Sequence, residues 1–175
     1  MGVQKFKIVA SQSTINWVGK KVTGAHNGTI DIKKGEVILK NGKLSAGNFI
    51  IDTTSIKVLN VTDPLANARF ASHLASDDFF ATQEFPEASL EITSVSGIHV
   101  QGNLSIKAIA HPIAFDAAVN VSGDLLTAAG LLVIDRTKYD MKFRSGNFFK
   151  DLGDSLIYNN FELNVSIVAK LKKNV

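Results

Sequence analysis

The stretch 98–121 is the part of the sequence that most constrains the fold, because apolar and polar residues alternate along nearly all of it. Side chains of a β-strand point to opposite faces in turn, so strands built from this stretch have one apolar face and one polar face. Residues 109–112 interrupt the alternation, which predicts an antiparallel hairpin with strands at 98–108 and 112–122. The same pattern returns at 161–171. A sheet of such strands must close on itself or stack against a second sheet.

Length and composition favour one folded domain. The chain has 175 residues, of which 45% are hydrophobic and 20% are charged. That composition supplies one core and does not suit a disordered chain, so we predict a single domain over 1–175. The formal net charge is only +3 and the lysines are scattered. We therefore expect no nucleic-acid partner, and we interpret the local excess at Lys170, Lys172 and Lys173 as a solvated edge.

Several classes of protein are excluded by what the sequence lacks. The chain contains no cysteine, which rules out disulfides, zinc–thiolate sites and thiol catalysis. It has no apolar run long enough to span a bilayer, and its first residues lack the apolar core of an export leader. We expect no transmembrane segment. As written, the chain is expected in the cytoplasm, or in the periplasm if a leader was trimmed before residue 1.

Glycine and asparagine divide the rest of the chain into strands. Turns are predicted at Lys34-Gly35, Asn41-Gly42, Ser96-Gly97 and Gly123-Asp124, because these pairs supply residues that tolerate a positive φ. A change of apolar parity around Ala46-Gly47 predicts a β-bulge, and bulged strands favour a closed barrel. Besides the hairpin, we predict strands at 5–10, 14–19, 27–33, 36–41, 43–55, 88–95, 125–135 and 160–171, and a weaker one near 140–145.

One of these strands is apolar on both faces. Residues Leu131 to Ile134 contain no polar side chain, so the outer face of this strand should be covered. A helix of the same chain or a second subunit would do so. The sequence thus leaves a homodimer, or an interaction module without ligand, as open alternatives.

Residues 63–86 break the rhythm of the strands. Asp63-Pro64 has the form of a helix N-cap followed by a proline in the first turn, and apolar residues recur after it at helical spacing. A short helix is predicted here. Three aromatic residues follow, and we expect them to close one end of a barrel, either as a lid over an apolar opening or as ordinary core. These residues are Phe79, Phe80 and Phe85.

The run from His73 to Phe80, followed by Phe85-Pro86, resembles the HLxSxDFF…(Y/F)P segment of the YceI-like family, the lipocalin-like polyisoprenoid-binding proteins. Agreement in order and spacing extends to 49–56, to 102–106 with Pro112-Ile113, to 135–139 with 144–146, and to 161–169. The resemblance covers nearly the whole chain. It implies an all-β fold, an antiparallel lipocalin-like eight-stranded barrel with a short helical insert at about 63–86.

The same resemblance implies a long apolar tunnel that holds an isoprenoid chain, such as a polyprenyl pyrophosphate or a quinone tail. Two features depart from the family. Many members carry an export leader, which this chain does not show, and Ala110-His111 stands where members often have threonine near the hairpin turn.

Residue parity predicts which side chains line this tunnel, and none of them is charged. Small residues on the same parity would leave space open; they are Gly102, Ala108, Ala117, Ala128 and Gly130. An eight-stranded barrel is just wide enough to be filled by side chains or to hold one small ligand. The residues predicted from parity are Phe49, Ile51, Leu90, Ile92, Leu104, Ile106, Ile113, Phe115, Leu132, Ile134, Phe161 and Leu163. The three aromatic residues of the insert, Phe79, Phe80 and Phe85, complete the predicted lining.

A ligand head group would need cationic or hydrogen-bonding residues near a mouth of the barrel. Arg136, Tyr139 and Arg144 are the candidates, since arginine suits phosphate. The competing interpretation is that the two arginines form structural ion pairs with Asp77, Asp78 or Asp140. We expect the length of the tail rather than the head group to dominate affinity.

Catalytic and metal-binding motifs are missing from the sequence. Its four histidines lack metal-ligand spacing, and it has no nucleophile motif, phosphate loop or paired carboxylates. We predict no metal, and no cofactor other than a bound polyisoprenoid or quinone-like lipid. The predicted function is binding, storage or transport of an isoprenoid or other long-chain apolar lipid, with no catalysis. The alternative is an enzyme that acts on a bound apolar substrate with His73 and either Asp78 or Tyr139.

Overall fold

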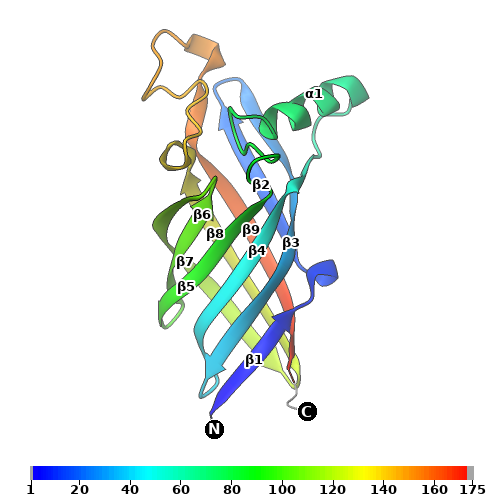
Figure 1. The fold of residues 1–175 in the computed structure, drawn as a ribbon, viewed down its shortest axis with the longest axis vertical. Helices are drawn as coiled ribbons and strands as arrows, with labels where there is room; N and C mark the ends of the chain where they lie inside the picture. Colours follow the sequence, from blue (N-terminus) through cyan, green and yellow to red (C-terminus); the bar gives the residue numbers. More distant parts are fainter. Residues whose placement is uncertain (1, 173–175) are drawn as a thin grey trace.

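The computed structural model describes residues 2–172, which form one antiparallel sheet closed into a barrel (Figure 1). One α-helix, α1 (Pro64–Leu74), and three short 3-10 helices, η1 (Ala10–Gln12), η2 (Arg136–Tyr139) and η3 (Gly153–Ser155), interrupt the strands. The strands are β1 (Val3–Ile8), β2 (Thr14–Lys21), β3 (Gly24–Lys40), β4 (Lys43–Val58), β5 (Glu87–Ser96), β6 (His99–Ile106), β7 (Ile109–Ser122), β8 (Leu125–Asp135) and β9 (Ile157–Leu171).

Two of the strands share one position in the barrel. Both β1 and β2 pair with β3 on one side and with β9 on the other, β1 in the lower half of Figure 1 and β2 in the upper half. The helix η1 separates them. With β3 also paired to β4, the sheet closes around eight strand positions. The predicted antiparallel eight-stranded barrel is confirmed.

Three of the four predicted turns are confirmed. The registers Lys40↔Lys43, Ser96↔His99 and Ser122↔Leu125 each leave two residues in the turn. The predicted bulge is also confirmed, because Ile38 pairs with Ala46 while the next residue pairs with Leu44. One extra residue, Ser45, therefore stands on β4 and bends it.

The predicted turn at Lys34-Gly35 is wrong, since β3 continues through it as one strand. A bulge at the preceding residue shifts the register there. Gly35 is needed for close approach instead: a Cβ at this position would lie 2.8 Å from the carbonyl oxygen of Asn48 and 2.9 Å from the ring of Phe49. A glycine that permits close contact between strands cannot be told from a turn glycine by composition alone.

The central hairpin forms as predicted, but its turn lies elsewhere. Ile106 pairs with Ile109, so Lys107 and Ala108 make the turn, with φ values of 55° and 60°. Neither residue commonly adopts a positive φ. The prediction from the sequence therefore put the turn at 109–112 instead. Ala108 consequently does not face the barrel interior. The weak strand predicted near 140–145 is also wrong, because this segment forms turns after η2.

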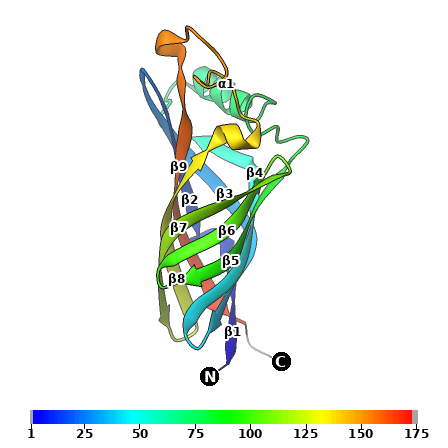
Figure 2. The same cartoon turned by 90° about the vertical axis from the view of Figure 1, so that its left-hand side faces the viewer.

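The helix predicted after Asp63 is confirmed. The Asp63 carboxylate accepts a hydrogen bond from the backbone N–H of Ala66 at 2.9 Å, which caps α1. The helix crosses one end of the barrel, and Figure 2 shows η2 at the same end. No helix within residues 2–172 is long and apolar enough to cross a membrane.

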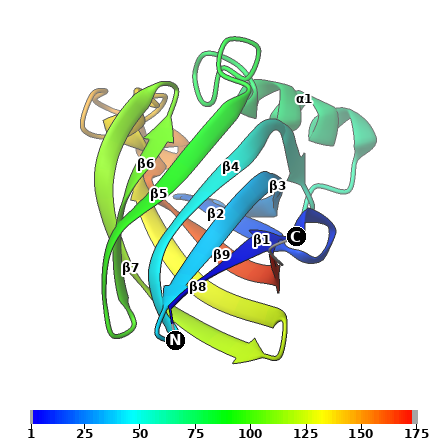
Figure 3. The ribbon, with the colours of Figure 1, turned by 60° about the horizontal axis from the view of Figure 1, so that its bottom comes forward.

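Within residues 2–172, nothing covers the outer face of β8. Leu131 and Val133 are 50% and 56% exposed. Seen from the lower end, α1 lies beside β3 and β4, on the far side of the barrel from β8 (Figure 3). The prediction that a helix of the same chain covers this face is therefore wrong. That a second subunit covers it stays a prediction.

Candidate functional site: an apolar cavity under a two-part lid

The barrel interior contains a cavity of about 450 Å³ with an almost wholly hydrocarbon wall. This volume lies within the range typical of small-molecule sites. Cross-strand pairs of small residues help to keep the space open: Ala117 pairs with Gly130, and Val119 pairs with Ala128 across β7 and β8. Ala117, Ala128 and Gly130 all line the cavity, as their parity predicted.

Most residues predicted as tunnel lining lie in the cavity wall. For the residues on strands, parity explains this, because a closed barrel directs one complete face of every strand inward. Phe79 and Phe80 reach the wall from the loop after α1. Whether they contact a ligand stays a prediction. The predicted residues found in the wall are Phe49, Ile51, Phe79, Phe80, Leu90, Ile92, Leu104, Ile106, Phe115, Leu132, Phe161 and Leu163.

Three predicted residues are not part of the wall. Phe85 stands in the turn before β5, where its carbonyl oxygen accepts a hydrogen bond from the hydroxyl of Thr53 at 2.7 Å. Ile134 is buried in the packed core, and Ile113 packs against that core. Both isoleucines have the inward parity, but parity does not say which inward side chains touch neighbours and which border empty space.

A further part of the wall comes from β2, β3 and α1, and we did not predict it from the sequence. The ring of Phe70 on α1 stacks on that of Trp17, with 6.5 Å between centroids, and lies 4.4 Å from the ring of His26. All three residues line the cavity. Burial and the charge of Lys21 lower the pKa of His26, which favours a neutral imidazole here. The inward parity of Ile15 and Trp17 was the signal available for β2.

Two segments close the upper end of the barrel, and together we call them the two-part lid: residues 75–86 after α1, and residues 136–156 between β8 and β9. Rings from both segments meet at His73, the last but one residue of α1. Its ring centroid lies 5.1 Å from that of Phe79 and 4.6 Å from that of Phe143. Phe79 and Phe143 are themselves 5.8 Å apart.

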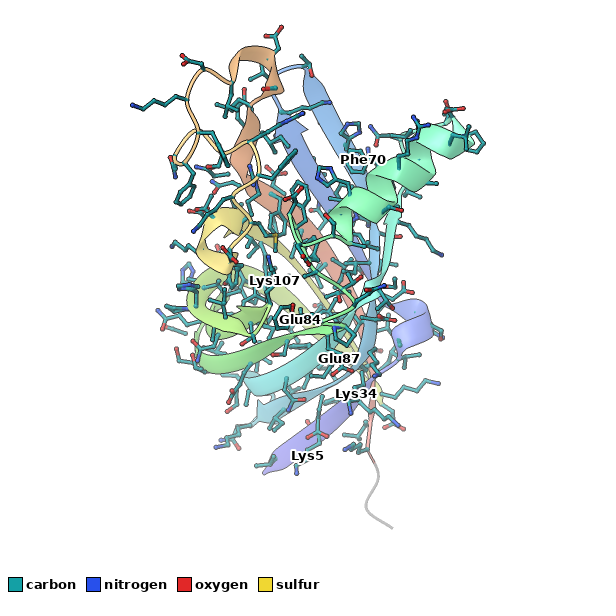
Figure 4. The ribbon with its side chains drawn as sticks, turned by 45° about the horizontal axis from the view of Figure 1, so that its top comes forward. Lys5, Lys34, Phe70, Glu84, Glu87 and Lys107 are labelled. Carbon is teal, nitrogen blue, oxygen red and sulfur yellow. The ribbon has the colours of Figure 1, made fainter. Side chains whose placement is uncertain are left out.

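A buried lysine makes a second link between the parts of the lid. The Nζ of Lys107, at the tip of the β6–β7 hairpin, donates to the carbonyl oxygen of Asp77 at 3.2 Å and to that of Asp140 at 3.0 Å. These carbonyls belong to different lid segments. Lys107 thus fixes both segments to the barrel from below (Figure 4).

Arg136 brings a buried cation to the cavity wall. It is 4% exposed. Its Nε donates to the carbonyl oxygen of Tyr158 at 3.1 Å, and its Nη1 and Nη2 donate to those of Met141 at 2.6 Å and Ile157 at 3.0 Å. Burial lowers the pKa of this guanidinium, and the charge of Asp135 opposes that effect. Within residues 2–172 its hydrogen-bond partners are carbonyls, so the predicted ion pair is wrong.

The other two head-group candidates differ in position. Arg144 lines the cavity mouth, with its guanidinium 4.9 Å from the centre of the Phe143 ring. Tyr139 is 1% exposed and lies outside the cavity wall. Its ring packs against that of His111 at 5.3 Å, and burial raises its pKa to about 12. Other polar residues at the wall that were not predicted from the sequence include Lys20, Lys21, Thr53, Tyr158 and Asn160.

His73 also makes a polar contact at the edge of the cavity. Its Nε2 lies 2.9 Å from the Oδ2 of Asp78, and both side chains are partly exposed. An enzyme that uses His73 with Asp78, one alternative predicted from the sequence, is consistent with this geometry. The version that uses Tyr139 is not supported, because the Tyr139 ring contacts a different histidine, His111. In the part of the chain that the structure describes, no group of three or more histidine or acidic side chains is placed to hold a metal ion.

Comparisons with known proteins agree with this architecture. A family model described as "YceI-like domain" matches residues 6–169. A UPF0312 protein of Staphylococcus aureus (strain bovine RF122 / ET3-1) is 37% identical over 81 residues, which cover 41% of this chain and 46% of the relative. A second, from strain USA300, matches to the same extent. The matched region thus spans about half the length of these curated relatives.

Solved structures with the same fold include BcnA of Burkholderia cenocepacia, with a TM-score of 0.68 and 20% identity over 91% of this chain and 98% of that one. A polyisoprenoid binding domain from Saccharophagus degradans, implicated in plant cell wall breakdown, has a TM-score of 0.69 and 12% identity over 95% and 98%. At these identities the likeness concerns the fold.

Proposed function

The chain belongs to the family of YceI-like domains, and from that premise we propose that it binds an isoprenoid or other long-chain apolar lipid in the barrel cavity, for storage or transport and without catalysis. The observation that carries this proposal is the cavity of about 450 Å³ with an almost wholly hydrocarbon wall. The similarity to a polyisoprenoid binding domain supports it further.

The tail of the ligand would supply most of the affinity. Transfer of each methylene from water into the cavity gains about 0.8 kcal/mol, before the cost of ordering the ligand. The cavity is bordered by the aromatic rings of Trp17, Phe70, Phe115 and Phe161. Such a wall selects for hydrocarbon and does little to distinguish one tail from another, except by length.

The head group would lie at the upper end, near Arg136 and Arg144. Arg136 uses three of its donors on carbonyls, and a guanidinium has five N–H donors. Two are therefore left for an oxygen of the ligand. We expect an Arg136→Met variant to lose affinity for a lipid with a phosphate head group by about tenfold, and to retain affinity for the alcohol with the same tail. Equal losses for both lipids would contradict this assignment.

Native mass spectrometry of freshly purified protein, with organic extraction of the bound material, tests the main proposal. A co-purifying long-chain lipid, together with binding of a purified polyprenyl lipid by the stripped protein, is the expected result. Stripped protein that is folded and takes up no long-chain lipid of any head group would refute the proposal.

A second candidate function is catalysis, which the contact between His73 and Asp78 favours. A carboxylate that orients an imidazole at the wall of a cavity is an arrangement found in general-base catalysis. This candidate predicts turnover of a bound lipid that is lost in His73→Gln. Unchanged lipid after prolonged incubation with wild-type protein would exclude it for the lipids tested, and the binding proposal would be unaffected.

A further inference from the structure

Lysine side chains gather on the outer face of the barrel near its lower end. Figure 4 shows Lys5 there, at the opposite end from Phe70 of α1. The outward residues of β1, the lower half of β3 and the end of β9 share this face, because the registers place them side by side. We call it the basic face; its lysines are Lys5, Lys7, Lys40, Lys43, Lys170 and Lys172.

The strand register places lysines directly opposite each other on this face. Lys7 pairs with Lys170 across β1 and β9, and Lys40 pairs with Lys43 across β3 and β4. Like charges in directly opposed positions destabilise a sheet. Protection of a sheet edge does not explain them, since β1 is paired on both sides. The repulsion is removed when an anionic partner covers the face.

The few acidic groups nearby do not balance these lysines. Glu36 lies directly opposite Lys7 across β1 and β3, and its carboxylate accepts a hydrogen bond from the Nζ of Lys172. Asp124 stands at the border, in the β7–β8 turn, where its carbonyl oxygen accepts a hydrogen bond from the N–H of Leu171. The formal charge of the whole chain is only +3, so six lysines on one face are a local concentration.

Apolar side chains lie between the lysines. Val3 on β1 is 56% exposed and Leu125 on β8 is 40% exposed. Val3 pairs with Lys40, and Leu125 pairs with Lys170. Among the residues of this face there is no arginine and no outward aromatic ring, which are the groups that recognise nucleic acid by bidentate contacts and by base stacking. Lysines that surround exposed aliphatic side chains suit a lipid surface with anionic head groups.

We propose that the basic face docks this protein on the surface of a bilayer that contains anionic phospholipids. The lysine ammonium groups contact the phosphates, and Val3 and Leu125 enter the interfacial layer. In this orientation the two-part lid is at the other end of the barrel and stays in the aqueous phase. The inference does not depend on the lipid cavity, because it uses only outward-facing residues.

Sedimentation with vesicles tests the proposal. Wild-type protein should bind phosphatidylcholine vesicles that contain phosphatidylglycerol, and should not bind vesicles of phosphatidylcholine alone. The double variant Lys7→Gln, Lys170→Gln should bind the anionic vesicles about tenfold or more weakly. Its melting temperature should stay close to that of wild type, because the substitutions remove the repulsion between Lys7 and Lys170 together with the attraction between Lys7 and Glu36. Weaker binding together with undiminished stability is a combination that misfolding does not produce.

The matched control removes the same charge elsewhere. Lys57 and Lys138 are exposed and lie outside the basic face, so the variant Lys57→Gln, Lys138→Gln should bind like wild type. Equal losses in both double variants, or no preference of wild type for anionic vesicles, would overturn the proposal. Tight binding of a single-stranded oligonucleotide without vesicle binding would overturn it as well. A variant with a filled cavity should still sediment, which separates this inference from the proposed lipid binding.

Discussion

The imidazole of His73 meets the ring of Phe143 edge-on, with 4.6 Å between the two centroids, and so one contact joins the end of α1 to the segment between β8 and β9. Phe79 completes the cluster from the loop after α1. Neither side of the two-part lid can move far without separating these rings. We therefore expect the ring cluster to control how readily the cavity opens.

Replacement of Phe143 by alanine should accelerate ligand exchange. The change removes two edge-on aromatic contacts, each worth about 1 kcal/mol, and we expect the dissociation rate of a bound fluorescent lipid to rise about tenfold. Stopped-flow measurement of that rate is the test. Phe149 lies in the same segment and is half-exposed, so Phe149→Ala serves as the control. Equal acceleration in both variants would show that the ring cluster does not gate the cavity.

A larger side chain at Ala117 should weaken lipid binding without unfolding the barrel. Leucine at this position would project into the cavity and displace about two methylenes of the ligand, a loss of about tenfold in affinity. Ala118 faces outward on the same strand, so Ala118→Leu adds the same side chain outside the barrel. Dissociation constants for one polyprenyl lipid measure the difference. Unaltered affinity in Ala117→Leu with an intact fold would mean that the tail lies elsewhere.

A Cβ at Gly28 should be strongly destabilising. It would lie 1.7 Å from the carbonyl oxygen of Lys57 and 2.6 Å from the ring of Trp17, so the backbone of β3 or β4 must shift. We expect Gly28→Ala to lower the free energy of unfolding by about 3 kcal/mol. A Cβ built on Gly19, in the neighbouring strand β2, would have no atom within 4 Å. We therefore expect Gly19→Ala to change the free energy of unfolding by less than about 0.5 kcal/mol. Urea unfolding of both variants distinguishes the sites.

Because Tyr139 has a raised pKa, we expect the protein to lose stability in alkaline solution. Its pKa is raised to about 12 in the folded protein, against about 10 in an unfolded chain. Below pH 10 the hydroxyl is protonated in both states. Between about pH 10 and 12 only the unfolded state ionises, so stability falls with rising pH, by about 2 to 3 kcal/mol in total from this group.

The hydroxyl of Tyr139 has no hydrogen-bond partner within the described residues. Tyr139→Phe should therefore cost little stability at neutral pH and should lessen the alkaline loss relative to wild type. Tyr158, which is half-exposed, is the control position. An alkaline unfolding profile of Tyr139→Phe that coincides with the wild-type profile would refute the assignment.

Most of the fold and of the cavity wall could be predicted from the alternation of apolar and polar residues along the strands. Phe115, Leu132 and Leu163 line the cavity because parity is a property of the strand itself, which the sequence displays directly. The turns at Asn41-Gly42 and Gly123-Asp124 were equally readable, since their residues tolerate positive φ. Lys107 and Ala108 carry no such signature, and the position of that turn was missed.

The remaining features of the site could not be predicted, because they depend on contacts between residues that are far apart in the sequence. The three carbonyl partners of Arg136 come from 141, 157 and 158, so its burial without a carboxylate could not be read from nearby acidic residues. The stacking of Phe70 on Trp17 depends on where α1 crosses the barrel. The opposition of Lys7 and Lys170 follows from closure of the sheet, which brings the first strand beside the last.

The shared strand position of β1 and β2 also determines how the barrel responds to mechanical force. The described chain, residues 2–172, begins and ends at the lower end of the molecule (Figure 1), and β1 is antiparallel to β9 in the pairs from Phe6↔Leu171 to Ile8↔Ala169. Tension applied between the termini loads these hydrogen bonds one after another, as in a zipper. The short first strand would peel away at low force, and β2, beyond η1, would meet the load as a separate second step.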